Sequence, residues 1–306
     1  MKIRFAPALQ RILEEDQPLS YAQLQVLSNL EPENLRAFCQ AWPAAPAERR
    51  QQVARALAQL NEDNTDLNYR DVFLVCLDDT DNVVRSAAIE GLGDDESSSL
   101  LERLMVLAAQ EPTVSLRSQA VLALGRFMQL IETTDFLSAY RLRLLQLLLA
   151  LFHDSTLPLE VRRRALESMS YASGSEDVER AISQAYDANE RELHVSAVHA
   201  MGHHLSERWR PMIERELKDP DPELRYEAAH ASGEMGDPQL VSPLAPLLDD
   251  DDHEVAQEAI WALGEIGGAK ARRLLERCLQ REDEDLQEAA ERALHVLQFN
   301  EDPLRM

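Results

Sequence analysis

The chain has 306 residues, of which 45% are hydrophobic but only 5% aromatic, and it contains 10 glycines. This composition is typical of an all-helical chain that packs on leucine, alanine and valine. The formal net charge of −24 argues against nucleic acid and anionic membranes as partners, because both require clustered Lys and Arg.

Residues 2–64 show helical periodicity between proline or acidic stops, without a close copy of any repeating unit. The predicted helices cover residues 4–15, 20–27, 32–42 and 47–60. We interpret residues 1–64 as two degenerate capping hairpins, because the end units of a repeat array must expose one face to water.

A repeating unit follows over residues 65–298. Its two clearest copies begin at Asp221 and Asp252, and each ends in glycine after the same pattern of charged, apolar and small residues. One position of each unit serves as a reference, which we call the anchor, and an alanine follows each anchor three residues later. Successive anchors are 31 or 32 residues apart, except for one spacing of 45 residues. The anchors are Arg85, Arg117, Arg162, His194, Arg225, Ala256 and Gln287.

These units resemble HEAT repeats over about residues 68–297, and their short period is similar to the HEAT-like repeats named after phycobiliprotein lyases. In that family helix B opens with Asp-Pro-Asp-x-x-Val-Arg, which residues 79–85 and 219–225 match. The resemblance implies an all-α solenoid of about nine helical hairpins in a superhelical stack, with the B helices lining its concave surface. We expect the aspartates to cap the helix N-termini.

The 45-residue spacing between Arg117 and Arg162 indicates an insertion. We predict a loop over residues 129–138, followed by a lengthened A helix over residues 139–153. The insertion either adds core, as surface loops commonly tolerate, or bends the stack or offers an apolar edge to a second copy. Residues 299–306 are predicted to be a C-terminal tail that caps the last repeat or frays.

The predicted binding site is a stripe of the B helices, at the positions one, five and nine residues after each anchor. We expect Trp261 and Tyr226 to be exposed anchors for a protein or peptide partner, with Arg163 supplying charge complementarity. The predicted partner-binding residues are Arg163, Glu167, Tyr171, His199, His203, Tyr226, His230, Glu234, Gln257, Trp261 and Glu265.

The same stripe contains a candidate metal site. His199, His203, His230 and Glu234 lie at equivalent positions of adjacent repeats, and imidazoles and carboxylates are suitable ligands for zinc or iron. A metal-binding protein or metal-dependent enzyme is therefore the alternative to a protein scaffold. Solvent-exposed, hydrogen-bonding histidines are a third possibility.

Two enzymes built on this scaffold match less well. Deoxyhypusine hydroxylase has an Arg-His-Glu motif at the start of its B helices, but the matching residues here are Arg225-Tyr226-Glu227 and Ala256-Gln257-Glu258. No cysteine falls on the predicted stripe to support bilin-lyase chemistry, and no nucleophile or cofactor motif is present.

We therefore predict a non-enzymatic protein-binding scaffold or adaptor without a cofactor. The most apolar run, residues 142–152, is too short to span a bilayer, and the N-terminus lacks a secretory signal, so we expect a cytoplasmic protein. The sequence names neither the partner nor the oligomeric state.

Overall fold

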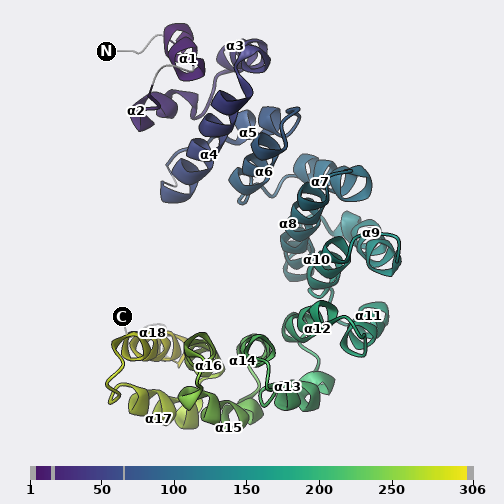
Figure 1. Ribbon diagram of the computed structural model, residues 1–306, viewed down its shortest axis with the longest axis vertical. Helices are drawn as coiled ribbons and strands as arrows, with labels where there is room; N and C mark the ends of the chain where they lie inside the picture. The colour runs from purple at the N-terminus through teal and green to yellow at the C-terminus, as the bar shows by residue number, and fades with distance from the viewer. Residues whose placement is uncertain (1–4, 15–17, 65, 302–306) are drawn as a thin grey trace. The chain divides into compact units, whose positions relative to one another are not determined.

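The computed structural model describes residues 5–14, 18–64 and 66–301, and every regular element among them is helical. The helices α1 to α18 alternate as the A and B helices of nine hairpins, which confirms the predicted all-α repeat fold. The chain divides into two compact units, residues 1–127 and residues 128–306 (Figure 1).

The first unit contains the four predicted N-terminal helices and the first regular repeats. B helix α4 packs against B helix α6, and the buried pair of Arg50 and Asp79 joins the two repeats, with Arg50 Nε 2.9 Å from the carboxylate. Asp79 also accepts the indole N–H of buried Trp42 at 2.7 Å. The helices are α1 (Phe5–Leu13), α2 (Tyr21–Leu24), α3 (Pro32–Ala41), α4 (Ala47–Asp63), α5 (Arg70–Cys76), α6 (Asn82–Gly91), α7 (Ser98–Gln110) and α8 (Val114–Thr133), of which α8 runs past the end of the unit.

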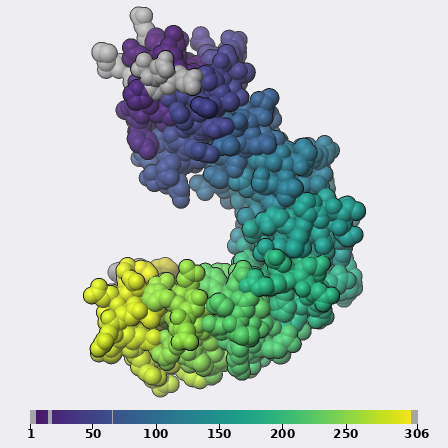
Figure 2. All heavy atoms as spheres, viewed as in Figure 1, coloured from purple at the N-terminus to yellow at the C-terminus, as the bar shows by residue number. Residues whose placement is uncertain are grey.

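The second unit stacks its hairpins in two rows. Figure 1 shows α11, α13, α15 and α17 in one row and α12, α14, α16 and α18 in the other. Consecutive B helices pack on one another. The space-filling view shows the residues of this unit following one another in chain order, from teal to yellow (Figure 2). The helices are α9 (Arg141–His153), α10 (Leu159–Met169), α11 (Glu176–Tyr186), α12 (Arg191–His204), α13 (Arg210–Glu216), α14 (Pro222–Met235), α15 (Val241–Leu244), α16 (His253–Ile266), α17 (Gly268–Cys278) and α18 (Glu284–Glu301).

Small residues allow the B helices to approach closely. The seven alanines that follow the anchors are fully buried, as their register predicts: Ala88, Ala120, Ala165, Ala197, Ala228, Ala259 and Ala290. A Cβ atom on Gly202 would lie 2.7 Å from the Cα atom of Ala231 in the next B helix, and one on Gly264 would lie 2.9 Å from the Cβ atom of Ala293. The glycine that closes these units is therefore required by helix contact.

The aspartates of the repeat motif have two different roles. Asp221 and Asp252 cap α14 and α16, since their side chains accept backbone N–H groups of the first turn. Asp219 and Asp250 are not caps, so the expectation that all these aspartates cap helices is wrong. Each accepts the N–H of the residue two positions later, and Asp250 also accepts from Nε and Nη2 of Arg225, both at 2.7 Å. Asp250 therefore ties its repeat to the previous B helix, α14.

The insertion lengthens a B helix, and the prediction of a loop over residues 129–138 is wrong. Helix α8 continues to Thr133, and α9 begins only at Arg141, after a short 3₁₀ turn over Ser138–Tyr140. The helix continues past Gly125 because Met128 and Ile131 extend its buried side and residues 126–133 contain no glycine or proline. The connection is reduced to residues 134–137.

Two further predictions concern the C-terminal tail and a membrane-spanning helix. Helix α18 continues through Glu301, and residues 302–306 of the predicted tail lie outside the described residues. No single helix in the described ranges is long and apolar enough to cross a membrane, although the bent pair α8 and α9 together reach that length and composition.

A histidine-rich candidate site on the B helices

The predicted binding residues lie on α10, α12, α14 and α16 and the turns that follow them, a surface that we call the B-helix face. Trp261 and Tyr226, which were expected to be exposed anchors, are only partly exposed. Gln257 is partly exposed and Glu265 is exposed. The indole of Trp261 is partly buried because it packs over Gly233, where a Cβ atom would lie 2.5 Å from the ring.

The α10 end of the face is occupied by internal contacts. Glu167 is buried, and it accepts hydrogen bonds from Ser196 Oγ at 2.7 Å and from Arg164 at 2.8 Å. Arg163 donates to the same Ser196 hydroxyl at 2.9 Å and lies 4.0 Å from Glu167. These two predicted contact residues therefore join α10 to α12, and Arg163 is not a free cation.

Three histidines converge where α12 meets α14. His199 and His203 are one turn apart on α12, and His230 stands opposite them on α14. One ring nitrogen of each lies within 4.8 Å of one ring nitrogen of the other two. The structure thus brings together three of the four residues proposed as metal ligands.

Each of these histidines has a glutamate at its Nδ1 atom. The Nδ1 atom of His199 lies 3.1 Å from Glu227, and that of His230 lies 2.8 Å from Glu258. Glu234, the fourth proposed ligand, lies 3.4 Å from Nδ1 of His203 and 4.0 Å from Nε2 of His230. It therefore acts on the histidines through charge and orientation.

Glu227 and Glu258 stand out in the sequence beside the repeat anchors, but their pairing with the histidines was not predicted. In both pairs the glutamate follows its histidine by 28 residues, so it lies two residues after the anchor of the next repeat. The recurrence of a His and a Glu at that separation in two adjacent repeats is the signal that identifies the pairs.

Aromatic rings surround the histidines. The ring of His230 stacks between His199, at a centroid distance of 5.8 Å, and Trp261, at 4.9 Å. The Tyr171 ring lies 4.5 Å from the His203 ring, and its hydroxyl is 3.4 Å from Nε2 of that histidine. The three histidines are therefore held between an indole and a phenol.

Carboxylates on the face shift the pKa values of the groups beside them. Burial of His230 disfavours its charged form, but the hydrogen bond to Glu258 and the nearby carboxylates outweigh burial and raise its pKa. The hydrogen bond from His203 is the largest cause that lowers the pKa of Glu234. Burial, followed by the charge of Glu258, raises the pKa of Tyr226 to about 12. At neutral pH the glutamate is therefore ionised and the phenol neutral.

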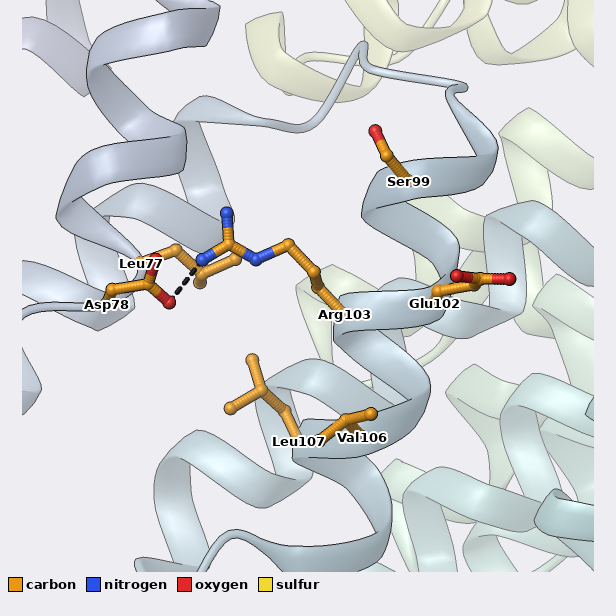
Figure 3. Close-up of a pocket in the computed structure, with 7 residues that line it drawn as sticks. All are labelled: Leu77, Asp78, Ser99, Glu102, Arg103, Val106 and Leu107. Atoms are coloured by element: carbon orange, nitrogen blue, oxygen red, sulfur yellow. Dashed lines mark hydrogen bonds and ion pairs between the residues drawn. The ribbon is translucent and has the colours of Figure 1, made fainter.

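Two other features do not involve these histidines. His253, Asp283 and Asp285 form a second group with metal-ligand atoms close together, but all three are exposed. A pocket of about 450 Å³ lies between A helices α5 and α7 of the first unit (Figure 3), where Arg103 pairs with Asp78 and donates to the Leu74 carbonyl at 3.0 Å. This pocket was not predicted from the sequence, because its lining comes from two different repeats.

Comparison with known proteins identifies the fold family. The model of the HEAT-repeat family matches residues 70–170 and 210–295. A search of curated proteins by sequence finds no significant match.

Among solved structures, yeast importin-beta (Kap95p) is similar with a TM-score of 0.58 and 14% identity, over 98% of this chain and 47% of importin-beta. A designed armadillo repeat protein has a TM-score of 0.38 and 20% identity, over 65% and 98% of the two chains. Human deoxyhypusine hydroxylase has a TM-score of 0.31 and 19% identity, over 96% of both chains. The family match covers more than half of the residues, and the chain belongs to the HEAT-repeat family.

Proposed function

We propose that the chain is a non-enzymatic scaffold that binds an extended, basic segment of a protein partner along its B-helix face. The observation that carries this proposal is the row of partly exposed aromatic side chains, Tyr171, Tyr226 and Trp261, which follow α10 or lie on α14 and α16. Aromatic residues in partly enclosed positions supply much of the energy of protein interfaces.

The charge of the face supports a basic partner. Glu265 is exposed and Glu234 is partly exposed, next to Trp261 and the histidines. Arg163, which was expected to supply positive charge, is engaged by Ser196 and Glu167. With a net charge of −24 on the whole chain, complementary Lys and Arg side chains belong on the partner.

The length of the segment follows from the spacing of the helices. Adjacent helix axes lie about 8–10 Å apart, so the four B helices from α10 to α16 span about 30 Å. An extended chain rises about 3.4 Å per residue, and roughly nine residues therefore cross the face. An extended segment would present a new side chain to each helix about every third residue.

A library of nine-residue peptides tests the proposal. We expect wild-type protein to select peptides rich in Lys and Arg, and Trp261→Ala to weaken their binding by about tenfold or more. Leu142→Ala is the matched control, because Leu142 is 65% exposed on A helix α9 of the same unit. Selection of acidic peptides, or equal binding by wild type and Trp261→Ala, would refute the proposal.

A further inference from the structure

We propose that His199, His203 and His230 bind one divalent transition-metal ion, with Zn²⁺ as the best match. This inference goes beyond protein binding and does not depend on it. It starts from the convergence of three ligand atoms within 4.8 Å of one another. Tetrahedral Zn²⁺ with Zn–N bonds of about 2.0–2.1 Å needs ligand nitrogens about 3.4 Å apart. Side-chain rotations that move each ring by about 1 Å would close that difference.

The frame of the site comes from two helices held at close range. His199 and His203 are four residues apart on α12 and therefore project from one side of it. Gly202 lies between them in the sequence and meets the backbone of Ala231, the residue after His230. The close approach that places the two helices therefore also places the third ligand.

The glutamates complete the arrangement expected around a bound metal. Metal-binding histidines nearly always direct their second nitrogen to a carboxylate or carbonyl, which fixes the tautomer and the ring orientation. Here the Nδ1 atoms of His199, His203 and His230 lie 3.1, 3.4 and 2.8 Å from glutamates. This pairing leaves Nε2 of each ring for the metal, with the Tyr171 hydroxyl bordering Nε2 of His203 at 3.4 Å.

The ligand set selects the class of metal. Imidazole nitrogens suit Zn²⁺ and its neighbours in the first transition row, whereas Ca²⁺ and Mg²⁺ require oxygen ligands. Three protein ligands leave one position of a tetrahedral ion open to solvent or to a partner group. The His203 side chain is 10% exposed, while those of His199 and His230 are 29% and 26% exposed, so the open position faces water.

Cobalt titration of the untagged, EDTA-treated protein tests the site. We expect one Co²⁺ per chain, with the intense visible absorption of tetrahedral Co²⁺, and displacement by Zn²⁺. Co²⁺ should also quench the fluorescence of Trp261, whose ring lies 4.9 Å from that of His230. His199→Ala and His230→Ala should each lose the visible spectrum.

Control variants separate this site from other causes of metal binding. His253→Ala removes the exposed second group and Cys39→Ser removes an exposed thiol, and both should bind Co²⁺ as wild type does. Glu258→Gln keeps all three histidines and should weaken binding by about 10- to 100-fold, which distinguishes loss of the site from loss of the fold. Far-UV circular dichroism checks that each variant is helical.

The inference is overturned if Co²⁺ shows no tetrahedral spectrum, if His253→Ala abolishes binding, or if His199→Ala binds as wild type does. Trp261→Ala distinguishes the two proposals, because it removes a peptide contact but no metal ligand. Metal binding that survives Trp261→Ala together with lost peptide binding supports both proposals, and each can fail without the other.

Discussion

Replacing Asp250 with alanine should destabilise the second unit by about 3 kcal/mol. Both carboxylate oxygens accept from the Arg225 guanidinium at 2.7 Å, and one also accepts the Asp252 N–H at 2.9 Å. The side chains of Asp250 and Arg225 are only 9% and 16% exposed. Breaking a buried pair costs about 3–5 kcal/mol, and the low end applies because Arg225 retains backbone carbonyl partners.

The neighbouring residue provides the control. Asp249 pairs with Arg281, but its side chain is 79% exposed, so Asp249→Ala should change the free energy of unfolding by less than about 1 kcal/mol. Urea unfolding followed by circular dichroism measures both variants. Because repeat arrays can unfold in parts, hydrogen exchange of α14 and α16 should locate the loss in these helices.

The pH dependence of the difference tests its electrostatic origin. The hydrogen bond from Arg225 is the largest cause that lowers the pKa of Asp250 in the folded chain. The stabilisation is therefore present above the ordinary aspartate pKa of about 3.9 and is lost as pH falls through the lower folded value. Wild type and Asp250→Ala should differ equally at pH 5 and 7 and converge below about pH 4. Equal effects of the two alanine variants, or a difference independent of pH, would refute this reasoning.

Three further predictions test packing and exposure within the second unit. Gly202→Val should lower stability by about 1–3 kcal/mol, measured by urea unfolding, because its side chain would collide with the backbone of Ala231. Tyr186→Phe should cost about 1–2 kcal/mol in the same assay, because the phenol donates to buried Glu216 at 2.5 Å. Trp261→Ala should remove most acrylamide quenching of tryptophan fluorescence, because the other two tryptophans are buried.

The repeat was predictable because its signal is local. Alanine register and helix periodicity depend on residues within one hairpin, and all seven register alanines are buried as expected. The length of the insertion was also visible, but a spacing alone does not say whether residues 129–133 extend the helix before the gap or the one after it. Partial burial of Trp261 could not be predicted, because it depends on Gly233 of the preceding B helix.

Contacts between repeats were harder to predict, since they require the rotation of one B helix against the next. The same contact between neighbouring B helices recurs in the first unit, where Gln119 Nε2 donates to Glu90 at 3.1 Å. Glu90 and His199 both lie five residues after an anchor, and Gln119 and Glu227 both lie two residues after the next anchor. The contact between these two positions is therefore a general feature of the repeat, and in the second unit a histidine takes part in it.

This shared contact identifies His203 as the residue that makes the candidate metal site specific. A histidine and glutamate pair occurs in two adjacent repeats, so His199 and His230 alone would make a repeated structural contact. The residue nine positions after the anchor is Asp94 in the repeat of α6 and Glu265 in the repeat of α16. Only the repeat of α12 has histidine both five and nine residues after its anchor. Three imidazoles can therefore meet in this register only between α12 and α14, and His203→Ala should abolish the tetrahedral Co²⁺ spectrum while leaving both histidine–glutamate pairs in place. Retention of that spectrum would assign the metal to other ligands.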